Sequence, residues 1–345
     1  MGIVGKAGSC FFLLLMALSY DAATPAQAAS PRAVKIMIIS MFKPEGDVWR
    51  EPLGLTEEIA VPGLSPEFPF VRCNASDVCQ MTTSMGHANA AASVMALVFS
   101  GSFDLSHTYF LIAGIAGIDP KMGTLGSAAW ARYLIDFGIT HEIDAREKPA
   151  QWPSGFIGID TTGPDQKPNM HYRTELFRLN EDLLQWAYAL SVKVTLKDND
   201  QAADYRRHYK EKAAMGAPTV LLCDTEASDT YWHGALIGAA VENWTTLLTD
   251  GKGVYCTAQQ EDNASLEALR RGAAAHLLDL QRVADLRTAA NFDRPYPGED
   301  AATSMTAKTG GFPISIANLV LAGMPLVTEI TSHWDKWSAG VPPRH

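Results

Sequence analysis

The stretch from Tyr109 to Pro120, YFLIAGIAGIDP, places the strongest constraint on the fold of this chain. Its first part, ending at Ala113, is a short apolar run rich in β-forming residues and closed by a glycine, which predicts a buried strand. We expect Gly114 and Gly117 to turn the backbone sharply after this strand and to expose amide groups there. Ligands bind at this end of the strands in open α/β sheets. Two glycines alone are an equally good signal of a simple tight turn.

Residues 1–28 have the pattern of a secretory signal peptide. Lys6 supplies a positive charge, residues 11–18 form an apolar core, and Ala26 and Ala28 form a small-residue cleavage site. The apolar core is shorter than the about 20 residues that span a bilayer. We therefore expect an exported, periplasmic or secreted protein in which residues 29–345 form a single domain.

The composition describes a globular protein without an obvious polyanionic partner. The formal net charge is −10, and no cluster of Lys and Arg occurs in the sequence. This balance argues against nucleic acid or an anionic membrane surface as the main partner. The apolar residues around Leu319 are short and interrupted by glycine, so we expect no membrane-spanning segment after the signal peptide.

Four cysteines follow the signal peptide, and three pairings of them exist. Cys73 and Cys79 flank a turn-like polar segment between two apolar runs, which is compatible with a bridge across a hairpin. Cys223 and Cys256 each lie in a strand-like stretch, and for them we slightly favour two buried free thiols over a disulfide. No spacing of Cys and His indicates a metal site.

Strand-like and helix-like patterns alternate along the mature chain, which predicts a three-layer α/β fold. The ranges that we expect as strands are 34–40, 70–73, 78–82, 109–113, 140–147, 218–223, 253–258 and 283–290. Those that we expect as helices are 174–191, 204–215, 265–275 and 314–321. Residues 41–47, which include Glu45 and Asp47, are expected as a polar loop, and residues 53–70 as mostly irregular.

Two further segments suggest a binding site. Near Gly86 a strand meets a helix that is expected to begin at about Asn89, and the amides of such a helix start favour an anion or a polar oxygen. Small residues in this helix also serve simply to bring it close to the sheet. The loop 224–234 combines carboxylates with Tyr231, Trp232 and His233, which indicates a pocket rim, although a single histidine is usually structural.

Five segments together resemble the purine nucleoside permease (NUP) family, within the nucleoside phosphorylase-like superfamily. They are VPGLS (61–65), YFLIAGIAG (109–117), GTLGS (123–127), YCTAQQED (255–262) and LRTAANFD (286–293). The resemblance extends over nearly the whole mature chain. It implies an αβα sandwich with a central mixed, twisted sheet, and purine nucleosides as ligands with no cofactor other than phosphate as a co-substrate.

The resemblance also implies roles for individual residues. Glu261, at a strand end that opens a helix, is expected to bind the ribose diol, while Asn291 and Tyr231 are expected to hold the purine. The residues expected to allow close approach of the nucleoside, or to line its pocket, are Gly114, Ala116, Gly117, Gly86 and His233. The catalytic candidates are Asp293, as an acid beside the departing base, and Glu45 or Asp47, which would orient an attacking water.

One departure from the superfamily concerns phosphate. Where phosphorylases place an arginine and a serine near the central turn, this chain has Ile112 and Ile115, and neither side chain binds an anion. Lys43 or the amides near Ser84 and Gly86 are the remaining candidates for that task. Asn291 also stands where an acid would donate a proton, and an amide has none to give.

Three functions remain open at this point. The first is cleavage of the N-glycosidic bond of a purine nucleoside, by phosphate or by water. The second is a non-enzymatic nucleoside-binding component of transmembrane nucleoside transport, with an inner-membrane transporter as its partner, since the chain itself contains no carrier. The third is a fold whose pocket has degenerated. A homo-oligomer is compatible with each of these.

Overall fold

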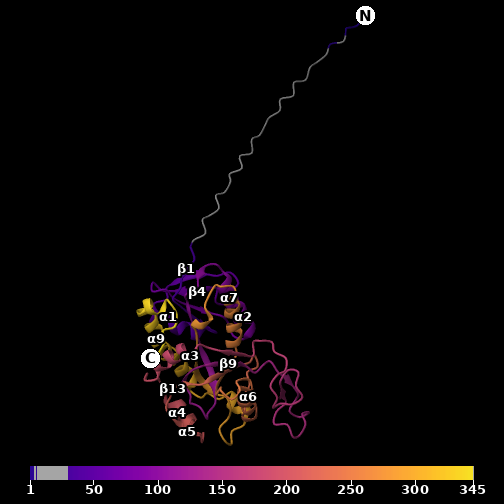
Figure 1. Ribbon diagram of the computed structural model, residues 1–345, viewed down its shortest axis with the longest axis vertical. Helices are drawn as coiled ribbons and strands as arrows, with labels where there is room; N and C mark the ends of the chain where they lie inside the picture. Colours follow the sequence, from indigo (N-terminus) through magenta and orange to yellow (C-terminus); the bar gives the residue numbers. More distant parts are fainter. Residues whose placement is uncertain (4, 6–29, 345) are drawn as a thin grey trace. The chain divides into compact units, whose positions relative to one another are not determined.

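The computed structural model describes residues 1–3, 5 and 30–344 (Figure 1). From Pro31 onward the chain forms one compact unit. The predicted signal peptide, residues 1–28, lies mainly outside the described residues and stays a prediction.

A large mixed sheet forms the centre of this unit. In spatial order its strands are β12 (Leu176–Arg178), β9 (Tyr133–Asp136), β14 (Asp224–Ala227), β15 (Tyr255–Gln259), β7 (Tyr109–Ile118), β2 (Ile36–Ser40), β5 (Val78–Thr82), β4 (Phe70–Cys73) and β3 (Glu57–Ala60). Strand β16 (Val283–Phe292) pairs with β7 and β8 (Ala128–Trp130), and β8 pairs with β13 (Val220–Leu222). Because β2 is parallel and β15 antiparallel to β7, the predicted mixed sheet is confirmed.

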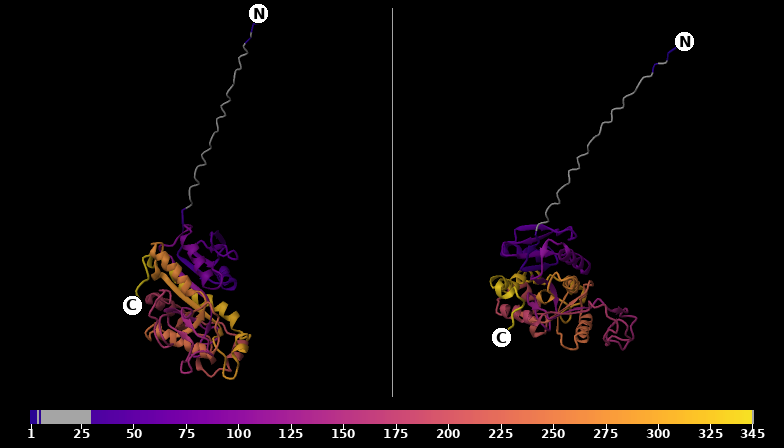
Figure 2. Two further views of the ribbon diagram at one scale, coloured as in Figure 1. Left: turned by 90° about the vertical axis from the view of Figure 1, so that its right-hand side faces the viewer. Right: turned by 45° about the horizontal axis from the view of Figure 1, so that its top comes forward.

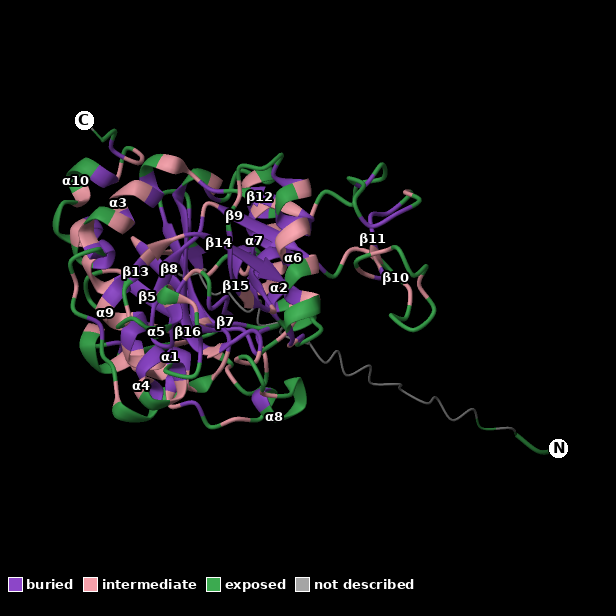
Figure 3. Cartoon of the chain, turned by 90° about the horizontal axis from the view of Figure 1, so that it is seen from below, coloured by how far each residue is buried: buried purple, intermediate pink, exposed green. Residues whose placement is uncertain are grey.

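Helices cover both faces of this sheet. The even-numbered residues Ile36 and Ile38 of β2 pack in one core with α1 (Lys43–Leu53), α3 (Glu181–Ser191) and α9 (Gly311–Ser332). The odd-numbered residues Met37 and Ile39 pack in a second core with α2 (His87–Phe99) and α7 (Asp262–Ala274). Figure 3 shows the mostly buried strands between these helices. Alternation along one strand thus separates two apolar cores, and the predicted three-layer sandwich is confirmed.

The remaining elements are short, except for α6. They are β1 (Arg32–Ala33), β6 (Phe103–Asp104), β10 (His141–Glu142), β11 (Phe156–Ile157), α4 (Asp200–Arg206), α5 (Lys212–Met215), α6 (Ala235–Leu248), α8 (Ala301–Met305) and α10 (Trp334–Trp337). The segment that contains β10 and β11 projects from the body of the domain (Figures 2 and 3). An edge strand over residues 140–147 was expected, but only His141 and Glu142 pair.

Several local expectations were wrong. Residues 41–47 do not form a loop, because α1 begins at Lys43 with Pro44 in its first turn, a position that suits the fixed φ of proline. The helix expected from residue 174 begins only at Glu181, after β12, where the side chain of Asn180 accepts from the amide of Leu183. The single helix expected over residues 204–215 is replaced by two short ones, α4, which begins earlier and ends at Arg206, and α5, which begins at Lys212.

The last long helix, α9, is also longer than residues 314–321, because it runs from Gly311 to Ser332. By length and composition alone, α9 is apolar enough to cross a membrane. Half of the residues in its most apolar stretch are buried inside the fold, and α9 packs against β16, α3 and α1. A helix that packs against a sheet in the core is also rich in apolar residues, and this packing accounts for the apolar composition of α9.

Strand β7 also continues further than expected. It does not end at Ala113 but runs to Ile118, and its register with β16 passes through Gly114 and Gly117. The predicted sharp turn at these glycines was therefore wrong. Close approach of other side chains, described below, explains the glycines instead.

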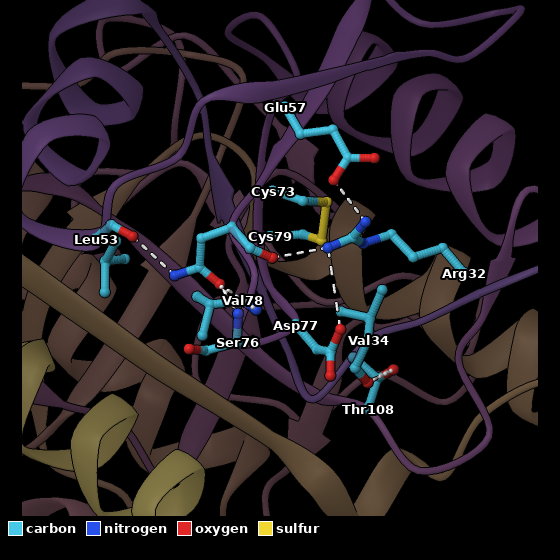
Figure 4. The surroundings of a disulfide bond; sticks show 11 residues. Arg32, Val34, Leu53, Glu57, Cys73, Ser76, Asp77, Val78, Cys79 and Thr108 are labelled. Atoms are coloured by element: carbon cyan, nitrogen blue, oxygen red, sulfur yellow. Dashed lines mark hydrogen bonds and ion pairs between the residues drawn. A yellow bond between two sulfur atoms is a disulfide. The ribbon is translucent and has the colours of Figure 1, made fainter.

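Both cysteine pairs form disulfides. Cys73 and Cys79 face each other in the β4–β5 register, as the hairpin pattern suggested. Arg32 ties this hairpin to its surroundings by binding Glu57 and the carbonyl of Asn74 (Figure 4). The slight preference for free thiols at Cys223 and Cys256 was wrong, since pairing of β14 with β15 brings them together.

Candidate functional site

The candidate site forms where strand β7 changes partners along one edge. The first part of β7 pairs with β2, and its last residues, Gly117 and Ile118, pair with β15. Between these ladders, no described strand lies beside Ile115 on this edge. Its amide donates to Glu45 Oε1 at 2.6 Å, and its carbonyl accepts from Arg287 Nη1 at 2.9 Å. Two charged side chains thus satisfy the backbone groups that a neighbouring strand would otherwise bind.

Glu45 lies in the first turn of α1, shortly after β2, and its side chain is buried. Its second oxygen, Oε2, accepts from the amide of Met41 at 2.8 Å. Burial raises the pKa of Glu45 to about 7, although the charge of Arg287 and the two amide hydrogen bonds act in the opposite direction. A carboxyl group with a pKa near neutrality is well suited to accept a proton at physiological pH.

Glu261 is the N-cap residue of α7, but its side chain does not cap the helix. Gln259 Oε1 takes that role and accepts from the amides of Glu261 and Asp262 at 2.7 and 2.9 Å. The Glu261 carboxylate is thereby available to the cavity. Its Oε1 accepts from the amide of Gly86 at 3.1 Å, and its Oε2 lies 3.3 Å from Arg287 Nη2.

Arg287 lies in the middle of β16, is 1% exposed and sits between the two glutamates. Asp262 accepts from both Nε and Nη2 of this guanidinium. Burial alone would lower the pKa of Arg287, but the carboxylates of Asp262 and Glu261 raise it above its usual value. Arg287 is therefore a permanent cation held among carboxylates.

The two glycines of β7 make room for these side chains. A Cβ on Gly114 would lie 2.9 Å from Glu45 Oε1 and would collide with Arg287 Nη1. A Cβ on Gly117 would lie 3.3 Å from Asn291 Nδ2. Close approach, and not a turn, is the reason for glycine at both positions.

A cavity of about 240 Å³ opens at this place, next to a space of about 20 Å³. The larger cavity is lined by Met41, Phe42, Glu45, Met85, Ile115, Ala116, Gly117, Tyr231, Ala258, Gln259, Gln260, Glu261, Arg287 and Asn291. Both are lined by Gly117, Tyr231, Ala258, Gln259, Gln260 and Asn291. The volume is below the roughly 300–1,000 Å³ of typical drug-sized pockets, which suits a small ligand.

Asn291 and Tyr231 lie at the end of the cavity shared with the smaller space. Asn291 Nδ2 donates to the carbonyl of Phe292 at 2.9 Å, which leaves its Oδ1 as an acceptor for a ligand. Tyr231 comes from the loop between β14 and α6 and is 54% exposed, so it forms part of the rim. Burial of its hydroxyl raises the pKa of Tyr231. The structure thus brings Glu261, Asn291 and Tyr231 to one cavity.

Two predicted site residues are placed differently. Asp293 lines only the smaller space, and its carboxylate accepts from Arg294 Nε at 2.7 Å, Arg294 Nη2 at 2.9 Å and the Tyr255 hydroxyl at 2.8 Å. Burial raises the pKa of Asp293, although these bonds to Arg294 and Tyr255 act in the opposite direction. His233 lines neither space, and both of its ring nitrogens are buried without a hydrogen-bond partner among the described residues, so its predicted place at the pocket stays a prediction.

Sequence reasoning missed Arg287, although it lies within one of the segments that carried the family resemblance. A signal was present, because Asp285 and Arg287 are opposite charges two positions apart in an otherwise apolar strand, and such residues point to the same face. Phe42, Met85 and Gln259 were also missed. Nothing local in the sequence distinguishes these three from ordinary loop and core residues.

Two of the expected substitutes for phosphate ligands are bound to other groups. Lys43 pairs with Asp47 on the exposed side of α1 and does not line the cavity, and the Gly86 amide is bound to Glu261. Arg287 is the cation that lines it. Within residues 30–344, no group of three His, Cys, Asp or Glu residues is arranged to hold a metal ion.

Solved structures named as a hydrolase and as a nucleosidase have a similar fold. The futalosine hydrolase of Helicobacter pylori has a TM-score of 0.53 and 13% identity, over 86% of this chain and 98% of that one. The 5'-methylthioadenosine/S-adenosylhomocysteine nucleosidase of the same organism has a TM-score of 0.51 and 12% identity, over 87% and 98%. At this identity the likeness shows the nucleoside phosphorylase-like fold.

Curated relatives are more similar in sequence. A probable purine nucleoside permease of Schizosaccharomyces pombe is 40% identical over 346 residues, which cover 95% of this chain and 99% of that protein. A purine nucleoside permease of Candida albicans is 38% identical over 308 residues, which cover 88% and 76%. The sequence pattern of the family described as purine nucleoside permease (NUP) matches residues 33–342. With this match and these relatives, the chain belongs to the purine nucleoside permease family.

Proposed function

We propose that this protein binds a purine nucleoside in the cavity at β7 and hydrolyses its N-glycosidic bond. The observation that carries the proposal is the position of Glu45, a buried carboxyl with a pKa raised to about 7, in the same cavity as Glu261 and Asn291. One end of the cavity offers a carboxylate for the ribose diol. The other offers an amide and an aromatic ring for a purine.

In this mechanism Glu45 acts as a general base toward a water molecule that attacks C1' of the ribose. The oxygen–C1' bond forms as the bond from C1' to the base nitrogen breaks, and the electron pair of that bond leaves with the base. Glu45 accepts the proton of the water, and the departing base takes a proton from solvent. The carboxylate of Glu261 favours the positive charge that develops on the sugar. We assign no proton transfer to Asp293, because its carboxylate is engaged by Arg294 and Tyr255.

The charge of the cavity favours water over phosphate as the nucleophile. Arg287 is already bound by Asp262 and faces Glu261, so its positive charge is compensated. A phosphate dianion entering beside Glu45 and Glu261 would meet net negative charge in a poorly screened site. A neutral nucleoside and a water molecule meet no such repulsion.

A binding component of nucleoside transport is the second candidate, favoured by the shared family with purine nucleoside permeases. The cavity contacts expected for binding are the same in both cases, and only Glu45 distinguishes the two functions. Export through the signal peptide, a periplasmic or secreted location, a homo-oligomer and an inner-membrane transporter as partner belong to this proposal as expectations from the sequence.

The test is incubation of the purified mature protein with adenosine or inosine, with and without phosphate, followed by chromatography of the free base. Release of base at the same rate in both buffers supports hydrolysis. Release that requires phosphate would replace hydrolysis by phosphorolysis. Tight binding of nucleoside without release would support the transport component, and absence of both binding and release would refute the site.

A further inference from the structure

We propose that Asp262 is a positioning residue that keeps the Glu261 carboxylate available to the ribose of the ligand, by holding Arg287. The proposal rests on the proposed function in one respect, namely that Glu261 binds the ribose hydroxyls. Asp262 does not line the cavity, and its side chain is fully buried. It therefore acts on the ligand only through Arg287.

The contacts of Arg287 are unequal. Asp262 binds the guanidinium through both carboxylate oxygens, with Oδ2 3.1 Å from Nε and Oδ1 in contact with Nη2. Glu261 offers a single oxygen to Nη2 at 3.3 Å, and Gln259 Oε1 lies 3.4 Å from the same nitrogen. A bidentate pair of Arg with a carboxylate forms stronger hydrogen bonds than a contact through a single oxygen. In the empty site, Asp262 is thus the main partner of Arg287 and Glu261 is a secondary one.

Because Asp262 is the main partner of Arg287, the Glu261 carboxylate remains available for a ligand. A buried guanidinium must be compensated by a nearby carboxylate, because an unpaired buried charge is strongly unfavourable. If Asp262 lost its charge, Glu261 would become the main partner of Arg287, since the two are already 3.3 Å apart. Its oxygens would then be occupied by the guanidinium and would no longer accept from a ribose diol. The charge on Asp262 prevents this competition.

Asp285 provides a matched control within the same cluster. It precedes Arg287 by two positions on β16, is 1% exposed, and neither of its carboxylate oxygens has a hydrogen-bond partner among the described residues. Burial and the nearby charge of Asp262 raise the pKa of Asp285 well above its usual range. Unlike Asp262, Asp285 makes no hydrogen bond to Arg287. These two buried aspartates therefore differ in whether they bind Arg287. Exchange of each for asparagine removes a carboxylate that holds Arg287 in only one case.

The experiment measures binding of two ligands to D262N, D285N and the wild-type protein by calorimetry. Formycin A, a nucleoside analogue whose base is joined through carbon, keeps the ribose and is not hydrolysed, whereas adenine lacks the ribose. For D262N we expect a Kd for formycin A that is about tenfold higher or more, as for loss of a charge-assisted hydrogen bond. The Kd for adenine should change less than about twofold, and D285N should match the wild type for both ligands.

A second comparison keeps the proposal testable if D262N does not fold. Because Asp262 acts through Arg287, the double variant D262N/R287Q should bind formycin A as well as R287Q alone. A further loss in the double variant would overturn the proposal, as would equal weakening of both ligands by D262N or no weakening at all. If the wild-type protein binds neither ligand, the proposed function itself fails, which is a distinct result.

Discussion

The carboxylate of Glu45 accepts a hydrogen bond from the backbone amide of Ile115 at 2.6 Å, across 70 residues of sequence. Ile115 lies between the residues of β7 that pair with β2 and those that pair with β15, so this hydrogen bond takes the place of one to a neighbouring strand. An opening in the sheet thus supplies both the cavity and the amide that orients its carboxylate. The catalytic candidate Glu45 is thus hydrogen-bonded to the middle of a strand.

The first prediction concerns Glu45 as the base. E45Q keeps the size of the side chain but cannot accept a proton from water, so base release should fall about 10²- to 10⁴-fold. Binding of formycin A should remain within a few-fold of the wild type, because Glu261 and Asn291 are unchanged. The measurement is single-turnover release of base from adenosine, with calorimetry for binding. Unchanged turnover in E45Q would remove Glu45 from the mechanism.

The same residue predicts a pH dependence of stability. Burial raises the pKa of Glu45 from 4.5 to about 7, so between these values the folded protein holds a proton that the unfolded chain has lost. Stability should therefore fall as pH rises through this window, by about 3 kcal/mol from this group. Gln does not titrate, so the free energy of unfolding of E45Q relative to the wild type should rise by about that amount from pH 4 to pH 8.

Urea unfolding at several pH values measures this difference. Asp119, whose pKa burial also raises to about 7, titrates in both proteins and cancels in the comparison. A difference between the two proteins that does not vary with pH would contradict the raised pKa of Glu45.

The glycine at position 114 predicts a third outcome. A methyl group in G114A would collide with Arg287 Nη1 and press on Glu45 Oε1, so both side chains must shift. We expect loss of base release by about 10²-fold or more, since small displacements of catalytic groups are costly. G216A is the control, because Gly216 has a φ of −71° and a Cβ there would make only ordinary contacts. Equal activity of the two variants would argue against close approach at Gly114.

The disulfides predict a graded effect on stability. The Cys223–Cys256 bond closes a loop with a sequence separation of 33, and the Cys73–Cys79 bond one with a separation of 6. Chain entropy alone then assigns about 4 kcal/mol to the first and about 2 kcal/mol to the second. Unfolding of C223S/C256S and C73S/C79S in denaturant measures the two losses. The reverse order would show that native-state effects outweigh loop closure.

Pattern and composition were sufficient for the fold class, and the family resemblance indicated part of the site. Alternating strand and helix patterns predicted the three layers, and the strand-to-helix junction at Glu261 and the strand position of Asn291 were found as expected. These features depend on local periodicity and on neighbours in sequence, which a chain shows without its fold. The Cys73–Cys79 bridge belongs to the same class, since six residues separate its ends.

Tertiary structure alone decided which polar groups meet. The residues that meet are distant in sequence or lie in apolar strands. Examples are the change of partner along β7, the contact of Glu45 with Ile115, the ion pair of Arg287 with Asp262 and the Cys223–Cys256 bond. Strand register and burial determine these contacts, and burial also determines which carboxyl groups have a raised pKa. The sequence by itself therefore determined the layers and the family, whereas the packing of strands against one another determined the charge and geometry of the site.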